Sequence, residues 1–411
     1  MTHGNCRICE ARLAVSFCDL GMSPLSNAYL DTEKLGDMEP FYPLHARVCG
    51  ECFLVQLDEF ETPAAIFSDY AYFSSYSDSW LAHAKQYTDA VIRRFKLGAS
   101  HRVVEVASND GYLLRYFKER GVAVLGVEPA ANVAQVAKQA GIPTVVRFFG
   151  IETARALVTE GHSADLLVGN NVLAHVPDVN DFVAGMKILL KPGGVITMEF
   201  PHLMRLMAEN QFDTIYHEHF SYFSLLTAQQ LFARHGLVLF DVEELSTHGG
   251  SLRIYGRHLE DGSKPIDAKV PSLIARERTA GLAQIETYAS FAEKVRETKR
   301  KLLEFLIVAK REGKTVVGYG APAKGNTLLN YCGVRGDFLE YTVDRSPHKQ
   351  DKFLPGTRIP VCSPDRIRET RPDYVLILPW NLKDEIVEQM AHIREWGGKF
   401  VVPIPEVQVV P

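Results

Sequence analysis

The chain has 411 residues, of which 46% are hydrophobic, and its formal net charge is −5. This length predicts two or three domains, and the weak negative charge excludes the basic surface of a nucleic-acid-binding protein or a polybasic membrane patch. No apolar run reaches the roughly 18 residues that cross a bilayer, and the opening residues MTHGNCRICEAR lack the regions of a signal peptide. We therefore expect a cytoplasmic enzyme without a nucleic-acid or membrane partner.

Residues 1–68 carry two Cys-x-x-Cys pairs among short apolar stretches with little helical period. In a reducing compartment such pairs are typical of metal binding rather than of disulfides. Four thiolates complete a tetrahedral zinc site and leave no open position, so this zinc would be structural. Four ordinary buried thiols are the alternative, which the matched spacing disfavours. The predicted ligands are Cys6, Cys9, Cys49 and Cys52.

Residues 69–258 alternate helical and strand patterns. A helical pattern, SWLAHAKQYTDAVIRRF, precedes the strand HRVVEVA, and later strand patterns are VAVLGVE, ADLLVGN and GVITMEF. Such a series predicts βαβ units over a parallel sheet. Two further strand-like runs, around His248-Gly249-Gly250, predict an antiparallel hairpin at the edge of that sheet.

The first strand of this series ends in a polar turn, VVEVASNDGYLL (103–114), that opens a helix. Such a turn presents backbone N–H groups to a ligand at the carboxyl end of the strand. Glu128 ends the next strand, where an acidic side chain can accept both hydroxyls of a ribose. Asn170, Asn171 and His175 follow a later core strand. These residues predict an adenosine-type ligand and leave both NAD and S-adenosylmethionine open.

The segments that follow this turn, GVEPA, NNVLAHVPD and LKPGG, resemble in their order the class I S-adenosylmethionine-dependent methyltransferases. The resemblance implies that the turn lines the methionine part of the cofactor and that Glu128 holds its ribose. A glycine-rich turn is usual in that family, whereas Ala107, Ser108 and Asn109 stand in the early positions here, so the pocket would be built partly from side chains. A sheet of this kind without a ligand is the alternative. The expected cofactor-binding residues are Glu105, Ser108, Asn109, Gly111, Glu128, Asn170 and His175.

A second candidate region is the run IYHEHFSYFS (215–224), which follows the strand ending in MEFPH. His217 and His219 are two residues apart, whereas a zincin needs histidines four apart on a helix, so the spacing disfavours a metal site. A packed aromatic loop with satisfied hydrogen bonds is one interpretation. A general base is the other, because methyl transfer to carbon requires removal of a proton next to a ketone, and an imidazole takes protons at neutral pH.

Residues 259–411 begin with charged, mostly helical sequence and continue as a second βαβ series. In VVGYGAPAKGN (316–326), Gly318, Gly320 and Ala323 match the pattern G-x-G-x-x-G/A, and Asp344 ends the next strand. Taken alone, this turn predicts an NAD-dependent oxidoreductase or a bare scaffold turn. Lys324 would place a positive charge where a pyrophosphate lies.

Together, the four-cysteine segment, the core with YHEHFSYFS and the terminal GYGAPAKGNTLLNYCG segment resemble the sugar C-methyltransferases of deoxysugar biosynthesis, over essentially the whole chain. The resemblance implies an α/β protein in three parts: a zinc-binding module (1–68), a class I methyltransferase core (69–258), and a C-terminal Rossmann-like domain (259–411). The last part would grip a nucleotide-linked, typically dTDP-linked, ketosugar instead of NAD.

The same resemblance implies roles for individual side chains. His219 would be the base, Tyr216 and Glu218 would flank the reacting carbon, and Tyr70 or Tyr72 would reach the sugar. His217 fills a variable position of the motif and is assigned no chemistry. On the substrate side we expect contacts from Tyr319, Lys324 and Asn326, and from two residues near the edge of the core, His248 and Ser251.

Overall fold

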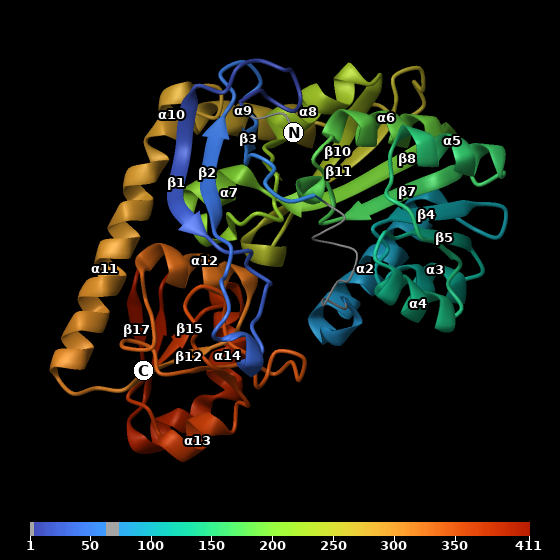
Figure 1. Cartoon of the computed structure of the whole chain (residues 1–411). Helices are drawn as coiled ribbons and strands as arrows, with labels where there is room; N and C mark the ends of the chain where they lie inside the picture. Colours follow the sequence, from blue (N-terminus) through green and yellow to red (C-terminus); the bar gives the residue numbers. More distant parts are fainter. Residues whose placement is uncertain (1–3, 63–73) are drawn as a thin grey trace.

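The computed structural model describes residues 4–62 and 74–411 and divides them among three β-sheets (Figure 1). A four-stranded sheet lies in the N-terminal part of the chain, a seven-stranded sheet in the middle and a six-stranded sheet in the C-terminal part. This is the α/β organisation that the sequence pattern predicts. Within these residues, no helix is both long and apolar enough to cross a membrane.

The four-stranded sheet is antiparallel and joins two distant parts of the chain. Its strands lie in the order β1 (Val15–Ser23), β2 (Tyr42–Val48), β3 (Val55–Gln56) and β9 (Ser221–Tyr222). Strand β9 comes from the middle of the chain and directly follows the residues IYHEHF. The sheet of the cysteine-bearing segment is therefore completed by the segment that carries His219.

The seven-stranded sheet forms the core that the strand–helix alternation predicts. Its order is β6 (Thr144–Val145), β5 (Ala123–Val127), β4 (Arg102–Val106), β7 (Ala164–Asn170), β8 (Leu190–Pro201), β11 (Ser251–His258) and β10 (Leu237–Leu245). The first five strands are parallel, and β11 is antiparallel to both of its neighbours, so that the predicted hairpin lies at the edge. The order of the strands reverses between β4 and β7. In open α/β sheets, ligands bind outside the carboxyl ends of the strands at such a point.

Helices cover both faces of this sheet (Figure 1). The consecutive valines Val103 and Val104 of β4 belong to two different hydrophobic clusters, one on each face, which explains why both positions are apolar. The helices of this region are α2 (Asp78–Phe95), α3 (Leu114–Glu119), α4 (Ala131–Gln139), α5 (Ile151–Thr159), α6 (Val179–Leu189), α7 (Leu203–Ala208), α8 (Leu225–Arg234) and α9 (Lys269–Thr279), with the 3-10 helix η4 (Phe212–Thr214).

The C-terminal sheet is Rossmann-like. Its order is β14 (Val361–Cys362), β13 (Thr342–Val343), β12 (Val316–Tyr319), β15 (Tyr374–Ile377), β16 (Lys399–Val402) and β17 (Gln408–Val410), and only the last strand is antiparallel to its neighbour. Its helices are α12 (Ala323–Cys332), α13 (Arg366–Thr370) and α14 (Lys383–Gln389). Helix α12 starts directly after the GYGAP turn, as the sequence predicts.

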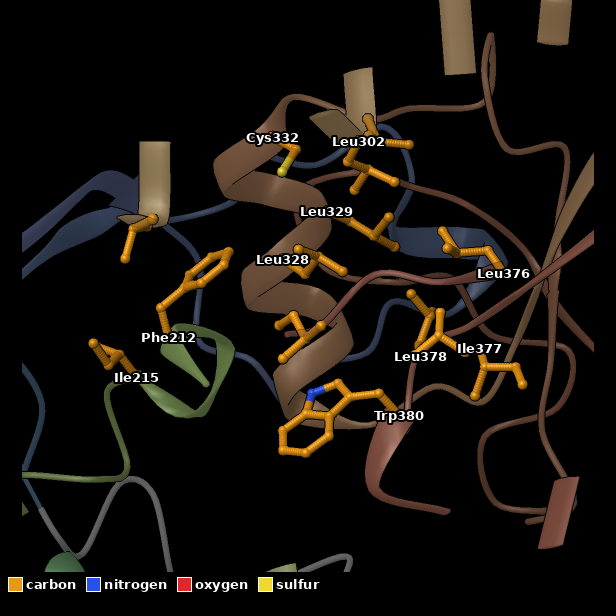
Figure 2. Close-up of a cluster of buried hydrophobic side chains, with 14 of the residues drawn as sticks. Phe212, Ile215, Leu302, Leu328, Leu329, Cys332, Leu376, Ile377, Leu378 and Trp380 are labelled. Carbon is orange, nitrogen blue, oxygen red and sulfur yellow. The ribbon is translucent and has the colours of Figure 1, made fainter. Parts of the chain in front are cut away.

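The three parts share apolar cores. Helices α10 (Ile285–Ala289) and α11 (Phe291–Arg311) connect the core to the C-terminal domain, and α11 extends along both the N-terminal and the C-terminal sheet (Figure 1). Phe291 stacks on Phe17 of β1, with ring centroids 4.6 Å apart. Figure 2 shows Phe212 and Ile215 beside α12, whose Leu328 belongs to the same buried cluster. This shared packing brings the candidate site residues of all three parts together.

The connection between β1 and β2, residues 24–41, lies on the C-terminal domain; we call it the β1–β2 loop (Figure 1). Leu30 and Phe353 exchange two backbone hydrogen bonds, of 3.0 and 2.8 Å. Asp31 forms an ion pair with Lys352 at 3.2 Å, and Arg358 donates to the carbonyl of Leu35. The loop therefore links the cysteine-bearing segment directly to the second Rossmann-like sheet.

Candidate active site

A cavity of about 980 Å³ lies where the three parts meet. Its wall includes Asn27 of the β1–β2 loop, Asn109 and Glu128 at the ends of core strands, His219 of the IYHEHF run and Lys324 of α12. Protein sites for small ligands commonly occupy about 300–1,000 Å³. This cavity is at the upper end of that range, so it has room for a cofactor together with a second ligand.

The turn after β4 adopts a glycine-like backbone without the usual glycines. Ala107 and Asn109 have φ values of 57° and 50°, in the left-handed region, and Gly111 has a φ of 78°. A Cβ atom on Gly111 would come within 2.9 Å of Ile142 Cγ1. The non-glycine residues thus preserve the backbone path of the turn at the cost of local strain, which accounts for the departure seen in the sequence.

Glu128 lies in the cavity wall beside this turn. Its carboxylate accepts hydrogen bonds from the backbone N–H groups of Asn109 and Ala130, both at 2.9 Å. Burial raises the pKa of Glu128 above its ordinary value. Because a carboxylate has about four acceptor positions, Glu128 keeps capacity for the hydroxyls of a ribose.

Glu105 and Ser108 lie behind the cavity wall and are almost completely buried. Among the described residues, neither carboxylate oxygen of Glu105 nor Oγ of Ser108 has a hydrogen-bond partner. Burial, followed by the charges of Asp110 and Glu128, raises the pKa of Glu105 well above its ordinary value. Buried acidic side chains with unused acceptors beside the turn fit S-adenosylmethionine, whose positive sulfonium and ammonium groups would favour the ionised carboxylates. Four of the expected cofactor residues line the cavity, namely Asn109, Glu128, Asn170 and His175, whereas Glu105, Ser108 and Gly111 do not.

The loop carrying Tyr216, Glu218 and His219 is held from the side of the cysteine-bearing segment. Leu57 donates its backbone N–H to the carbonyl of Phe220 at 3.0 Å, beside the β3–β9 pairing. His217 points the other way, with Nε2 3.2 Å from the carbonyl oxygen of Pro43, and its ring meets Tyr42 edge to face. His217 therefore has a structural environment, in keeping with its place as a variable residue of the motif.

His219 has a fixed tautomer and orientation. Its Nδ1 lies 2.9 Å from the carbonyl oxygen of Thr214, which can only accept, so Nδ1 carries the proton. Its Nε2 accepts the hydroxyl hydrogen of Tyr216 at 2.8 Å. The ring of His175 meets that of His219 edge to face, with centroids 4.7 Å apart. Burial, and then the neighbouring His175, lower the pKa of His219 well below its ordinary value, so the imidazole is neutral with its basic nitrogen beside Tyr216.

Glu218 is buried in the cavity wall without a cationic partner among the described residues. Its Oε1 accepts from Nδ2 of Asn27, at 2.7 Å, and burial raises the pKa of Glu218 to about 7. The carboxyl group is therefore close to half protonated at neutral pH. Sequence reasoning missed Asn27, because nothing in the spacing of residues 24–41 connects that loop to a residue nearly two hundred positions away.

Two predicted residues cannot be placed. Tyr70 and Tyr72 lie outside the described residues, so their role in reaching the substrate stays a prediction. Trp80, at the start of α2, does line the cavity and was not predicted. Its ring lies 5.2 Å from that of His248 and 5.0 Å from that of His83.

The second glycine turn is partly covered by the protein itself, although Pro322, Ala323 and Lys324 border the cavity. The hydroxyl of Tyr29, in the β1–β2 loop, and Nζ of Lys349 both donate to the carbonyl of Ala321. Asp344, which the NAD interpretation would assign to a ribose, accepts the backbone N–H of Ala321 at 2.8 Å. Gly320 has a φ of 87°, and a Cβ there would come within 2.5 Å of Pro379. The acidic group of Asp344 and the backbone groups of Ala321 are thus committed to internal contacts.

The structure brings only part of the expected substrate set to the cavity. Lys324 and His248 line it. Asn326 is buried and donates to the carbonyl of Ser26, Ser251 is buried and donates to Thr247, and the hydroxyl of Tyr319 donates to Gln389. These three side chains do not border the cavity, because they fix the β1–β2 loop, the β10–β11 turn and the C-terminal core, respectively. Lys349 and Lys352, which do border it, follow a strand end and carry no sequence signal beyond their charge.

The four paired cysteines form one cluster, as predicted. Cys6, Cys9, Cys49 and Cys52 place their sulfur atoms within 4.8 Å of one another, and two of the Sγ–Sγ distances are 3.4 Å. Three of the four are buried and the fourth is half-buried. Four soft ligands at this spacing suit one tetrahedral zinc ion. The remaining three cysteines lie elsewhere.

Three family models match the chain in succession. A putative zinc-binding domain matches residues 6–67, a methyltransferase domain residues 80–242, and a C-methyltransferase C-terminal domain residues 246–405. The C-methyltransferase NovU of Streptomyces niveus is 37% identical over 408 residues, which cover 98% of this chain and 96% of that protein. A ubiquinone biosynthesis O-methyltransferase of a Chelativorans strain is 28% identical over 96 residues, 23% of this chain and 38% of that protein.

Among solved structures, the PH0226 protein of Pyrococcus horikoshii covers 48% of this chain and 99% of its own length, with 16% identity and a TM-score of 0.37. An S-adenosylmethionine-dependent methyltransferase of Mesorhizobium loti covers 43% and 100%, with 17% identity and a TM-score of 0.34. The near-complete relative and the three matched domains show the family. The chain belongs to the C-methyltransferase family and is an S-adenosylmethionine-dependent methyltransferase with an N-terminal zinc-binding module.

Proposed function

We propose that this enzyme methylates the carbon alpha to the ketone of a nucleotide-linked deoxysugar, with dTDP as the nucleotide, and that it acts in the cytoplasm. For the three parts we propose the boundaries expected from the sequence: a zinc module over 1–68, the cofactor-binding core over 69–258, and a substrate domain over 259–411. S-adenosylmethionine supplies an electrophilic methyl group on a sulfonium. The acceptor carbon is not nucleophilic until it loses a proton, so the chain must provide a base.

The observation that carries this proposal is the orientation of His219. Its Nδ1 is held by the carbonyl of Thr214, and its neutral Nε2 accepts the hydrogen of Tyr216, so the lone pair that could accept a proton is on the side of Tyr216. Tyr216 and Glu218, with His219, line the cavity that the cofactor turn also borders. A base beside the cofactor is the arrangement that carbon methylation requires, whereas transfer to oxygen or nitrogen needs no α-proton.

The proposed reaction uses these residues in a fixed order. The nucleotide lies toward the C-terminal domain, where Lys349 and Lys352 border the cavity. When the ketosugar replaces the Tyr216 hydroxyl at Nε2, His219 takes the α-proton and the carbon becomes the nucleophile of an enolate. Tyr216 and Glu218 flank that carbon; Glu218, with its pKa raised to about 7, can donate or accept a hydrogen bond at neutral pH.

The test is a screen of dTDP-linked 4-ketosugars with S-adenosylmethionine, followed by NMR of the methylated product. We expect His219→Asn to lower kcat by about 10²–10⁴-fold while the affinity for S-adenosylmethionine, measured by calorimetry, stays near wild type. His217→Asn is the matched control, since that ring faces Pro43, away from the chemistry. Retained turnover in His219→Asn would reject His219 as the base, and methyl transfer only to oxygen or nitrogen would reject the reaction.

A further inference from the structure

We propose that Lys324 stabilises the enolate oxygen formed from the substrate's ketone, rather than binding the diphosphate that its place in a glycine-rich turn predicts. This inference rests on the proposed function, since it concerns the intermediate of that reaction. It assigns the oxyanion contact to the C-terminal domain, although the proposed base belongs to the methyltransferase core. The contacts of α12 are the first support for it.

Helix α12 is attached to the segment that orients the base. Thr327 of α12 donates its hydroxyl to the carbonyl of Ile215 at 3.1 Å, and η4, which ends at Thr214, packs against the same helix. Figure 2 shows Phe212 and Ile215 facing α12, with Trp380 near one end of the helix. Lys324 stands on the first turn of α12 and lines the cavity. The packing therefore holds the first turn of α12, with Lys324 at the cavity wall, beside the segment that orients the base.

The charges around Lys324 place it near the base as well. The positive charge of Lys324 contributes to lowering the pKa of His219, and it also helps to lower that of His248. Asp213, fully buried in η4, is affected in the opposite way: burial raises its pKa to about 7, and Lys324 opposes that rise. The ammonium group thus lies within electrostatic reach of both the proposed base and a buried acid.

Lys324 is held in one position but keeps free donors. Its Nζ donates to Oδ1 of Asn381 at 2.8 Å and lies 4.8 Å from the ring centroid of Trp380. The indole N–H of Trp380 in turn donates to Asp213 at 2.7 Å. An ammonium has three donors, and the contact with Asn381 is the one hydrogen bond of Nζ within the part of the chain that the structure describes. Two donors remain for a ligand.

The proposed reaction requires a hydrogen-bond donor at the ketone oxygen of the substrate. When His219 takes the α-proton, the C–H electron pair forms the new C=C bond and the carbonyl π pair moves onto oxygen, which becomes negative. An ammonium hydrogen bond to that oxygen stabilises the enolate. When the C=C pair forms the bond to the methyl group, the pair on oxygen restores the C=O bond, and the pair of the broken methyl–sulfur bond stays on sulfur. In a partly buried site, one such donor is worth about 10²–10³-fold in rate. The diphosphate has other cations available, because Lys349 and Lys352 border the cavity too.

The test compares Lys324→Met with Lys310→Met, a matched change at a surface lysine that pairs with Glu340. The substrate is the dTDP-linked 4-ketosugar that the wild-type enzyme methylates. NMR follows exchange of its α-hydrogen in D₂O without S-adenosylmethionine, and calorimetry measures the affinity for dTDP alone. We expect Lys324→Met to slow both exchange and kcat by about 100-fold, with the affinity for dTDP changed less than threefold. Lys310→Met should match wild type in every measurement.

A second variant distinguishes the loss of the positive charge from misfolding of the protein. Lys324→Arg keeps the positive charge, and we expect it to recover at least about tenfold of the lost exchange rate. A loss of dTDP affinity with unchanged exchange in Lys324→Met would overturn the assignment in favour of diphosphate binding. If Lys324→Met exchanges the α-hydrogen at the wild-type rate, only the role of Lys324 in stabilising the enolate is rejected. If the wild-type enzyme neither exchanges the α-hydrogen nor methylates any ketosugar, the proposed function and this inference are rejected together.

Discussion

The two glycine-type turns of this protein have the same strand–turn–helix arrangement but differ in the protein segments that surround them. Each follows a buried parallel strand and opens a helix, and an acidic residue ends the next strand in both. At the first turn, Glu128 and Asn109 face an open cavity. At the second, Tyr29 and Lys349 bond to the turn, and Asp344 accepts its backbone N–H. A nucleotide fingerprint therefore predicts the backbone path of a turn, while distant segments decide which groups of the turn remain available to a ligand.

The largest expected effect tests the two acidic residues against each other. Glu128→Ala should weaken S-adenosylmethionine binding by about 100-fold, because hydrogen bonds to a charged group contribute about 1.5–3 kcal/mol. Asp344→Ala should leave that affinity within about twofold of wild type, since the Asp344 carboxylate accepts a hydrogen bond from Ala321 in the second turn. Calorimetric titration of both variants provides the comparison. Equal losses in the two would mean that the second turn also contributes to the cofactor site.

The next effect concerns an acid beside the open cavity. Burial raises the pKa of Glu218 to about 7, so between about pH 4.5 and 7 the folded protein keeps a proton that the unfolded chain has lost. Ionising this buried carboxyl is unfavourable, so the protein becomes less stable as the pH rises through that window. Glu218→Gln lacks the titrating carboxyl, so its melting temperature relative to wild type should rise from pH 5 to pH 7 and then level off. The change Glu395→Gln, at an exposed glutamate, should show no such trend. A difference in melting temperature between Glu218→Gln and wild type that does not change with pH would contradict the raised pKa of Glu218.

Backbone conformation provides a third contrast between the turns. Gly320→Ala should destabilise the protein by about 1–3 kcal/mol, since it combines a left-handed φ with a close approach to Pro379. Ala107→Gly should instead change stability by less than about 1 kcal/mol, and in the favourable direction, because glycine relieves the strain of a φ of 57°. Chemical denaturation measures both. A stable Gly320→Ala variant would show that the second turn can relax.

The smallest effect removes one internal contact from the second turn. Tyr29→Phe deletes the hydroxyl that donates to Ala321, and the bond from Lys349 to the same carbonyl remains. We expect a loss of about 1 kcal/mol in stability, no measurable NAD binding and unchanged affinity for S-adenosylmethionine. Detectable NAD binding by the variant would show that the tyrosine alone closes a competent dinucleotide site.

The sequence allows the sheets to be predicted better than the contacts between them. Strand β4 is recognisable because three of its five residues are valine, as is typical of a parallel strand covered on both faces, and the cysteine cluster is recognisable from its spacing. The pairing of β3 with β9 is not, since each strand has only two residues, and β3 precedes the core in the chain whereas β9 lies within it. Asn326 shows the same difficulty: it stands in a ligand-binding pattern, yet its side chain is used to hold Ser26 of the β1–β2 loop. Local periodicity carries no information about such partners.

The place of β9 at the end of the zinc module's sheet has a practical consequence for dividing this chain. A protein trimmed to begin at residue 69 would keep His219, the cofactor turn and α12, but it would lose every strand that pairs with β9. The unpaired backbone next to the catalytic loop would then be open to water or to another molecule's strand. Fragments designed from domain boundaries alone should therefore aggregate or lose the loop's geometry, even though no catalytic side chain has been removed.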